Sequence, residues 1–564
     1  MSLFSALNVG MKGLHAAQVA IDTTGQNIAN ANTEGYSRKR VEMQADAIQD
    51  DVYGQMGIGV EVTSIVRVRN AFLDRQTWEQ LGDKGFYTEM DKAMVRIENI
   101  LKEPTDDGLA AHMDQFWSSW QDLANNPADM SAREAVKASA ATMIDVFQAA
   151  YKQIEDYGLS MNNPLSQKTK QVNDLTGQIY ALNERIAGVE ANPTENANDS
   201  RDQRDQLVRQ LSQLVDVQTI EDPQGRAIIT SGGNLLVGPS DAMQLETYGV
   251  DKVLSDGTLS SELRVRFTGS RRTFEPRAGE LKGVMDSRNT ILSTYLESLN
   301  TLSGAIVTQV NALHVSGYNL NKTTGIYFFD PKKLKANEIR LSDAVSGSSS
   351  NIAAAKGGTI VNVNEFATTV PAAGAPTMDL KTFNASYKDL VQGAVRIVRP
   401  DGALPPVDEV LQEGAGKDYV VDYERGIVTF LNYSKLTAGQ GIKVKIQYNS
   451  AGYPGSGNGQ NGLEIAQLRH KTTMGADNEG NPTQSIGEYY SAVIGRLGIE
   501  KNQNTSRLET KDFLVAQMDA EQASLAGVSL DEEMANMIKF ETSYQASAKF
   551  ISTINTMMDV LMNI

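Results

Sequence analysis

Few residues in this chain of 564 residues have the types and spacing that could do chemistry. Its four histidines, His15, His112, His314 and His470, stand alone, without a second ligand at a metal-binding interval or a His-Glu-x-x-His motif. Cysteine is absent, which excludes thiolate nucleophiles, thiolate metal ligands and disulfides. A Walker phosphate loop and a Gly-x-Ser-x-Gly elbow are missing as well. We therefore predict no catalytic residue, no cofactor and no metal site.

One segment matches a cofactor motif by its letters. Gly457-Asn458-Gly459-Gln460-Asn461-Gly462 follows the pattern of dinucleotide-binding loops. That fingerprint requires a tight turn directly after a buried strand within a βαβ unit, whereas loop residues intervene here and the preceding strand is amphipathic. We interpret these glycines as a flexible linker and keep a cytoplasmic dinucleotide-binding protein as an alternative.

The charge distribution bears on possible partners. A formal net charge of −17 opposes binding to nucleic acid and to anionic lipid, because phosphate contacts need clustered Lys and Arg. The compact basic clusters Arg38-Lys39-Arg40 and Arg271-Arg272 are interpreted as solvated or paired at subunit contacts. No apolar run approaches the roughly 18 residues that span a bilayer, and the first residues lack a cleavable signal pattern. We expect no nucleic-acid partner, no membrane insertion and no cleaved signal peptide.

Apolar residues at heptad spacing mark both ends of the chain. The first helix is expected to stop in the turn-favouring segment 29–36, and the last to begin near Leu530, where Ser529-Leu530-Asp531-Glu532 is typical of a capping box, and to run to Ile564. The second row of the first helix is Leu3, Gly10, Ala17 and Thr24. The predicted assembly interface comprises Leu3, Leu7, Leu14, Ile21, Ile28, Met537, Phe540, Tyr544, Ile551, Ile554, Met558 and Leu561.

The position of these apolar rows favours assembly. In most proteins such a row faces the core of its own bundle, but both rows here occupy chain ends, which are usually frayed. Burying four Leu or Ile side chains gains about 6 to 12 kcal/mol, whereas ordering a helix of about thirty residues costs about 30 to 60 kcal/mol in backbone entropy. We predict that a lone terminal helix stays disordered and that neighbouring copies supply the missing burial.

Between the ends, the pattern alternates between helical and β-rich segments. A small hairpin is expected near residues 54–62, and a turn at Asn125-Asn126-Pro127 interrupts the helical pattern. The expected helical segments are 72–101, 114–157, 175–189, 292–306 and 486–525, and the β-rich segments are 217–273 and 326–462, with a hairpin over 418–431 and a strand over 442–448.

These segments predict a multi-domain, mainly α fold with terminal coiled-coil helices, a long helical bundle and β-rich inserted outer domains. The predicted domains are a terminal coiled-coil inner domain (1–45 with 526–564), a helical bundle (46–216 with 274–325 and 463–525), a β-rich domain (217–273 with 326–357) and an inserted β-rich outer domain (358–462).

Both ends resemble the signatures of flagellar rod, hook and hook-associated proteins. The resemblance lies in residues 7–18 and 27–38, and in residues 527–536, 544–548 and 551–553. Its signature positions are Asn27, Asn30, Thr33, Gly35, Tyr36, Ser529, Leu530, Asp531 and Glu532. Within that group, residues 311–317 before 325–329, together with 125–127, are similar to the hook-associated protein 1 family.

The resemblance implies a structural protein without enzymatic activity, located extracellularly in the bacterial flagellum. It implies a homo-oligomeric ring that joins hook to filament, with hook protein below and hook-associated protein 3 above. It also implies export in the unfolded state through the flagellar type III apparatus, helped by a dedicated chaperone on the C-terminal segment. The alternatives are a hook or distal-rod protein of the same group, and a secreted enzyme carried in the insert at residues 358–455.

Overall fold

The computed structural model describes residues 3–46, 48–51, 54–57, 59–192, 195–253, 259–357, 362–371, 377–380, 390–400, 408–410, 413, 417, 419–422, 427–431, 441–448, 457–476 and 480–562. The chain divides into two compact units. The first unit comprises Met1–Ala93, Leu159–Ile291 and Lys501–Ile564, and the second comprises Met94–Gly158 and Leu292–Glu500.

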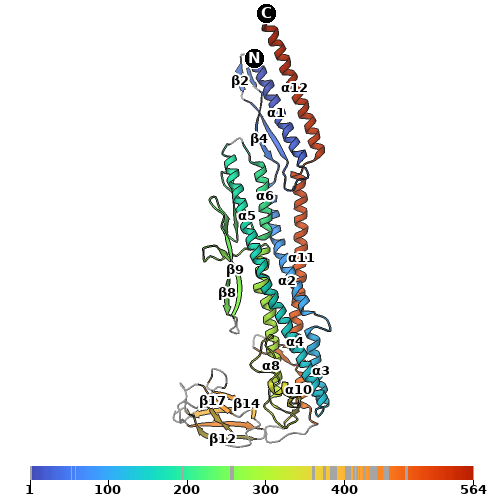
Figure 1. Ribbon diagram of the computed structural model, residues 1–564, viewed down its shortest axis with the longest axis vertical. Coiled ribbons are helices and arrows are strands. Elements are labelled where there is room, and N and C mark those ends of the chain that lie inside the picture. Colours follow the sequence, from blue (N-terminus) through green and yellow to red (C-terminus); the bar gives the residue numbers. More distant parts are fainter. Residues whose placement is uncertain are drawn as a thin grey trace. The chain divides into compact units, whose positions relative to one another are not determined.

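The two ends of the chain pair within the first unit. Helix α1 (Leu3–Ala29) lies antiparallel beside α12 (Leu530–Met562), as Figure 1 shows. Strands β1 (Lys39–Ala45) and β4 (Val60–Arg67) form an antiparallel pair against α1, and β2 (Ile48–Asp51) pairs with β3 (Gly54–Gly57). The expected end of the first helix and the expected start of the last are confirmed, whereas the predicted closure at Ile564 lies outside the described residues.

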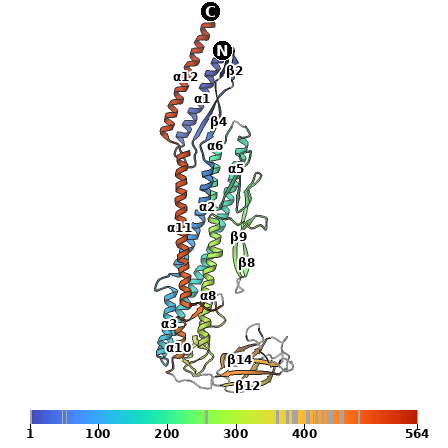
Figure 2. The ribbon, with the colours of Figure 1, turned by 180° about the vertical axis from the view of Figure 1, so that it is seen from behind.

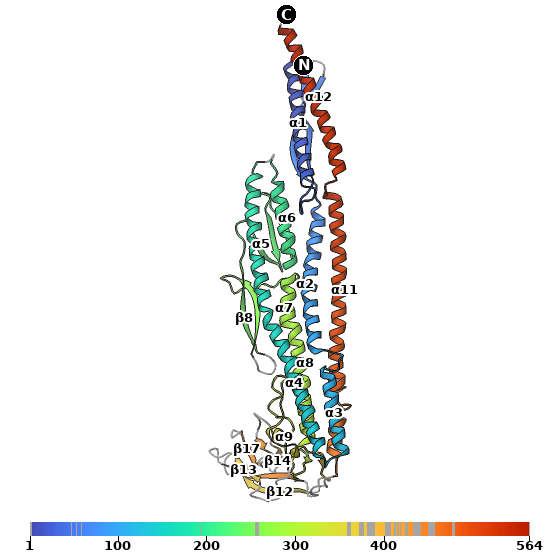
Figure 3. The same cartoon turned by 45° about the vertical axis from the view of Figure 1, so that its right-hand side comes forward.

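The rest of the first unit is a helical layer with small sheets. It contains parts of α2 (Ala71–Leu101) and α11 (Ile486–Ala526), which run antiparallel (Figure 2). Helix α5 (Asn162–Val189) lies beside α6 (Asn198–Leu214). Helix α7 (Glu280–Asp286) and the π-helix η1 (Ser287–Ile291) come later in the chain. Strands β5 (Gln218–Glu221), β6 (Ala227–Ser231) and β7 (Asn234–Val237) form one sheet, and β8 (Leu245–Val253) pairs with β9 (Leu259–Phe267). Strand β8 lies against α5 (Figure 3), and Val172, Ile179, Leu211 and Ile229 fill the core.

The second unit is a helical cluster around aromatic side chains. Besides the remaining parts of α2 and α11, its described helices are α3 (Leu109–Asn125), α4 (Met130–Ser160, up to Gly158 in this unit), α8 (Leu292–His314), α9 (Asp343–Gly347), the 3-10 helix η2 (Ser349–Asn351) and α10 (Gln460–Gln467). Its short strands are β10 (Gly317–Tyr318), β11 (Ala355–Lys356), β19 (Thr472–Met474) and β20 (Gln484–Ser485). Phe116, Trp120, Phe328 and Phe329 pack with ring centroids 4.8 to 6.3 Å apart.

Two sequence-based expectations fail in this unit. Residues 326–357 are not β-rich, because they contain α9, η2 and only the two-residue strand β11 among their named elements. The glycine segment 457–462 is not a flexible linker, since a Cβ atom on Gly459 would collide with the Ala124 carbonyl, and Gly462 also lies against Ala124. The glycines there permit α10 to pack closely on the end of α3.

Residues 362–448 contain two facing sheets. The first has the order β12 (Asn362–Thr369), β18 (Gly441–Tyr448), β14 (Leu390–Pro400) and β15 (Asp408–Val410), and the second has β13 (Thr377–Asp379), β17 (Ile427–Phe430) and β16 (Tyr419–Asp422). Their common core includes Ile397, Val428, Phe430 and Val444. The predicted hairpin over 418–431 and the strand β18 are confirmed, while residues 423–426 between β16 and β17 lie outside the described residues. The grouping into four domains stays a prediction.

Candidate assembly interface

The two terminal helices approach each other across a face of small residues on α1. A Cβ atom added to Gly10 would lie 2.8 Å from Ile551 Cγ1 and 3.0 Å from Phe550 Cδ1, and one added to Gly13 would lie 3.0 Å from Ser547 Oγ. Ala17, which lies two turns beyond Gly10 on the same face, is buried. Small side chains allow the two helix backbones to lie close together, so α1 and α12 of one chain pack closely at this face.

The predicted interface residues do not all lie on that face. On α1, the row Leu7, Leu14, Ile21 and Ile28 is half-buried, whereas Gly10, Ala17 and Thr24 of the second row are buried. On α12, Ile554 is buried, Met537, Phe540, Ile551 and Met558 are half-buried, and Tyr544 is just over one-third exposed. The side chains of Leu3 and Leu561 lie outside the described residues. Contact of these residues with other copies stays a prediction.

Large apolar side chains elsewhere on the two helices are exposed. On α12, Leu530, Met534 and Ile538 are 48%, 50% and 65% exposed. On α1, Phe4 and Met11 are 73% and 57% exposed. Phe550, Met557 and Val560 add further exposed apolar surface on the C-terminal half of α12. Large apolar side chains exposed along a helix are the kind of surface at which proteins contact other molecules.

Asn27 forms hydrogen bonds at the end of the helix pair where α1 ends beside the start of α12. Its Nδ2 donates to the Lys39 carbonyl at 2.9 Å and to Glu533 Oε2 at 3.0 Å. Its Oδ1 accepts from the Lys39 N–H and from the Tyr36 hydroxyl, both at 2.9 Å. Asn27 and Glu533 are almost fully buried, so every one of these bonds satisfies a group that water does not reach. The amide fits because it donates and accepts at once.

The other signature residues shape the turn and the helix start that surround Asn27. Gly35 has φ of +79°, a left-handed conformation that glycine adopts without strain, and the Thr33 hydroxyl donates to Asn30 Oδ1 at 3.2 Å. Burial and the carboxylates of Asp199, Asp202 and Glu533 raise the pKa of Tyr36 to about 12, which keeps its hydroxyl a donor.

At the start of α12, two carboxylates of the first turn form ion pairs. Arg38 contacts Glu532 Oε2 and Glu533 Oε1, both at 2.7 Å. The Ser529 carbonyl accepts the Glu533 N–H at 2.9 Å, and Asp531 is exposed in the first turn, where the helix dipole favours a negative charge. In a capping box, the Glu532 side chain would turn back to the start of its own helix. Here its carboxylate contacts Arg38 and so connects α12 to the segment after α1.

A buried ionic network connects this segment to α6 and α2. Asp202 Oδ2 accepts the Ser37 N–H at 3.0 Å, and its Oδ1 accepts from the Ser37 hydroxyl and from Arg67, both at 2.7 Å. Arg67 also pairs with Asp205 at 2.9 Å. Arg69 binds Asp74 through two nitrogens at 2.6 and 3.0 Å. Sequence reasoning missed this network, although the acidic residues of 198–206 recur at helical spacing.

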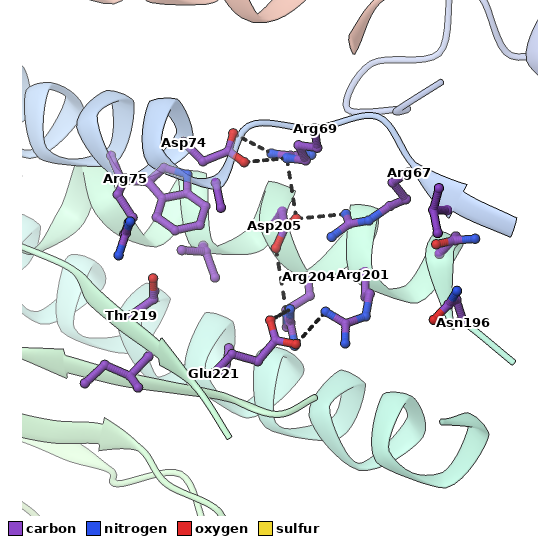
Figure 4. Close-up of a pocket in the computed structure, with 17 residues that line it drawn as sticks. Arg67, Arg69, Asp74, Arg75, Asn196, Arg201, Arg204, Asp205, Thr219 and Glu221 are labelled. Atoms are coloured by element: carbon purple, nitrogen blue, oxygen red, sulfur yellow. Dashed lines mark hydrogen bonds and ion pairs between the residues drawn. The ribbon is translucent and has the colours of Figure 1, made fainter. Parts of the chain in front are cut away.

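The network borders a cavity of about 470 Å³, shown in Figure 4. Arg67, Arg69 and Arg204 converge on Asp205, while Glu221 meets Arg204 and Arg201. Burial lowers the pKa of Arg204 despite its acidic neighbours. Because these arginines face carboxylates of the same chain, the arrangement fits a rigid joint rather than a catalytic centre.

The four histidines take structural or surface positions. His314 is fully buried, its Nδ1 donates to the Ile326 carbonyl at 2.7 Å, and its Nε2 accepts the Ala353 N–H at 2.8 Å. His15 and His470 are exposed, and His112 is half-buried. Across the described ranges, no group of three His, Asp or Glu side chains could hold a metal ion, and no helix has the length and apolarity to cross a membrane.

Known sequences that match this chain come from the bacterial flagellum. The "Flagellar hook-associated protein FlgK helical domain" family matches residues 94–329. The terminal helices match two further families, "Flagella basal body rod protein" over residues 7–36 and "Flagellar basal body rod FlgEFG protein C-terminal" over residues 523–564. Both ends of the chain, which pair as helices, are therefore similar to families of flagellar rod proteins.

Relatives along the whole length narrow the assignment. The chain is 26% identical over 575 residues to flagellar hook-associated protein 1 of Bacillus subtilis (strain 168), covering 100% of this chain and 98% of that protein. It is 27% identical over 579 residues to flagellar hook-associated protein 1 of Escherichia coli (strain K12), covering 99% and 100%. The flagellar hook junction protein FlgK of Burkholderia pseudomallei shares the fold, with a TM-score of 0.54 and 18% identity over 80% of this chain and 100% of that one. The chain is thus similar along its whole length to flagellar hook-associated protein 1, the family that residues 311–317, 325–329 and 125–127 indicated.

Proposed function

We propose that this protein forms the junction between the flagellar hook and the filament, as a ring of identical copies joined through their terminal helices. The observation that supports this function is the exposed apolar surface of α1 and α12, which a single chain leaves uncovered although the same helices already pack through small residues. Covering such surface with further helices is the main driving force of association.

The polar base of the helix pair supports the same proposal. Asn27, Arg38 and Glu533 fix where α12 starts relative to the end of α1, and Asp202 ties the intervening segment to α6. A ring needs each copy to present its terminal pair in one direction, and a buried network with satisfied hydrogen bonds sets a direction more sharply than apolar packing does. The signature residues therefore act as positioning residues for assembly.

The finer partners belong to the proposal as well. The similarity to flagellar hook-associated protein 1 supports contacts with hook protein on one side and with hook-associated protein 3 on the other, export in the unfolded state, and a chaperone on the C-terminal segment. The proposed role is structural, not catalytic. Terminal helices that gain their order only from neighbours would suit a chain that is exported unfolded.

Truncation tests the proposal. Removing residues 1–28 or 530–564 is expected to abolish incorporation at the hook–filament boundary, measured by antibody labelling of isolated flagella. The thermal transition of the second unit is expected to stay unchanged. A matched pair of point variants sharpens the test. Ile538→Asp, at an exposed apolar site, is expected to reduce incorporation strongly, and Thr542→Asp, one turn further at an exposed polar site, to leave it unchanged. Full incorporation of either truncated chain contradicts the proposal, and labelling along the hook or the rod instead favours the alternatives.

A further inference from the structure

We propose that the cavity between α2, α6 and β5 binds a free, doubly charged oxyanion of the class of phosphate and sulfate. This cavity of about 470 Å³, drawn in Figure 4, lies within the first unit. Its volume falls in the range of small-molecule sites. The anion would connect these three elements within one copy of the chain, whatever the arrangement of copies in an assembly.

The charged side chains that line the cavity are mostly positive, although the chain as a whole is acidic. Five arginines and three carboxylates line it, a formal charge of +2 in a chain with a net charge of −17. Two further carboxylates, Asp202 and Glu190, pair with two of these arginines but do not line the cavity. An anion in the cavity therefore meets a positive surface. The charged lining residues are Arg67, Arg69, Arg75, Arg201, Arg204, Asp74, Asp205 and Glu221.

Arg75 brings an unpaired charge to this cavity. It lies near the start of α2, its side chain is exposed, and no carboxylate pairs with it among the residues that the structure describes. Its neighbour in the sequence, Asp74, is already bound by two nitrogens of Arg69. Figure 4 shows the Arg75 side chain extending from α2 toward Thr219. The Arg75 guanidinium is thus available to an anion.

Thr219 brings a hydroxyl to the cavity from a second element. It lies on β5, two residues before Glu221, and side chains two positions apart share one face of a strand. That face meets the cavity, because Glu221 contacts Arg204 at 3.3 Å and Arg201 at 2.7 Å. A hydroxyl can donate a hydrogen bond to an oxyanion.

Arg204 brings a buried cation to the cavity from α6. Only 3% of its side chain is exposed, and its Nε lies 3.7 Å from Asp205 Oδ1, too far for a hydrogen bond. This Nε has no hydrogen-bond partner among the described residues. Burial lowers the pKa of Arg204, although the charges of Asp205 and Glu221 oppose the change. The neighbouring carboxylates therefore do not fully offset the cost of burying this charge, and a bound anion would offset it further.

The arrangement of these donors favours a doubly charged anion over a carboxylate. Arg75, Arg204 and Thr219 belong to three different elements, so they approach the cavity from different directions. A tetrahedral oxyanion presents oxygens in several directions, whereas a carboxylate presents two oxygens in one plane and carries one charge. Two charges also match the surplus of +2 on the lining.

Calorimetric titration of the purified full-length chain with inorganic phosphate tests the proposal. We expect saturable binding at one site, and a thermal midpoint of the first unit that rises by about 2 to 5 °C at saturating phosphate. Arg75→Ala is expected to weaken phosphate binding about tenfold or more, because a hydrogen bond between charged groups is lost. Arg185→Ala, at an exposed arginine of α5 outside the cavity, is the matched control and should bind phosphate as the natural chain does.

Two further measurements separate the site from general effects of salt and charge. Sodium acetate at the same ionic strength supplies a singly charged carboxylate and is expected to bind at least about tenfold more weakly than phosphate. Glu221→Gln removes a carboxylate from the lining and is expected to bind phosphate more tightly, opposite to the effect of Arg75→Ala. Phosphate also stabilises folded proteins through its exclusion from their surface, but that effect is equal in all variants.

Absence of saturable phosphate binding, or equal binding by Arg75→Ala and the natural chain, would overturn the proposal. Equal weakening by Arg185→Ala would show that the anion responds to overall charge, and it would overturn the proposal too. Acetate binding as tight as that of phosphate would overturn the assignment of a doubly charged anion. None of these measurements involves incorporation at the hook–filament boundary, so the proposed function is tested separately.

Discussion

Acidification is expected to destabilise the second unit through His314, at the centre of its aromatic cluster. The neutral ring is fixed by two hydrogen bonds, donating from Nδ1 to the Ile326 carbonyl and accepting at Nε2 from the Ala353 N–H. Its ring lies 6.1 Å from Trp120 and 5.4 Å from Phe328, measured between centroids. A proton on Nε2 would remove the acceptor and leave a charge in an apolar, water-free site.

The size of the effect follows from the pKa. Burial lowers the pKa of His314 from 6.5 to about 4, with the Ile326 hydrogen bond opposing the change and the charge of Arg133 adding to it. The unfolded chain therefore binds the proton more readily, so this contribution to stability is present above pH 6.5 and is lost as the pH falls from 6.5 to about 4. At about 1.4 kcal/mol for each pH unit between the two values, the loss is about 3 kcal/mol.

The assay compares thermal unfolding of the second unit at several pH values between 7 and 4 with that of His314→Gln, whose amide can donate and accept at the same places but does not titrate. We expect the natural chain to lose about 3 kcal/mol more than this variant between about pH 6.5 and 4. His470→Gln, at an exposed site, controls for general charge effects and should keep the full loss. Equal pH dependence in the natural chain and in His314→Gln would refute the reasoning.

Three further predictions concern the joint between the terminal helices and the rest of the first unit. Asn27→Ala removes one hydrogen bond from the buried Glu533 carboxylate and two from the Lys39 backbone, and it is expected to destabilise the assembled helix pair by about 3 kcal/mol. This loss would be seen as release from isolated flagella at lower urea concentration, whereas Asn30→Ala, whose bonds are exposed, changes release little. Gly10→Val is expected to force α1 and α12 apart at a loss of about 1 to 3 kcal/mol in the same assay, and Gly25→Val, with open space around it, to lose much less; equal effects would contradict the close packing. Asp202→Asn removes the charge between Ser37 and Arg67 and is expected to lower the thermal stability of the first unit by about 2 kcal/mol, so an unchanged transition would show that the network does not hold the joint.

Features with local causes could be predicted from the sequence. The start of α12 follows from Ser529 and the acidic residues after it, and the end of α1 follows from the turn-favouring residues that begin at Asn30. The β16–β17 hairpin and the strand β18 follow from alternation of apolar and polar residues. In each case the residues that determine the feature lie next to it in the sequence.

Features that depend on distant contacts could not be predicted. The bond between Asn27 and Glu533 joins positions 506 residues apart, and neither residue differs locally from a surface residue. Heptad spacing also could not tell which row of α1 faces α12, because the row of large residues and the row with Gly10 have the same period. Gly459 was misinterpreted for a similar reason, since its need for close packing arises from Ala124, more than three hundred residues earlier.

Amide hydrogen exchange of the terminal segments, compared between the free chain in dilute solution and the chain in isolated flagella, tests most directly whether assembly orders them. We expect the amides of α1 and α12 to exchange rapidly in the free chain, while those of α3 stay protected, and to become protected once copies surround them. Strong protection of both terminal helices in the free chain would show that they are ordered without neighbours, and it would contradict the proposed source of their stability.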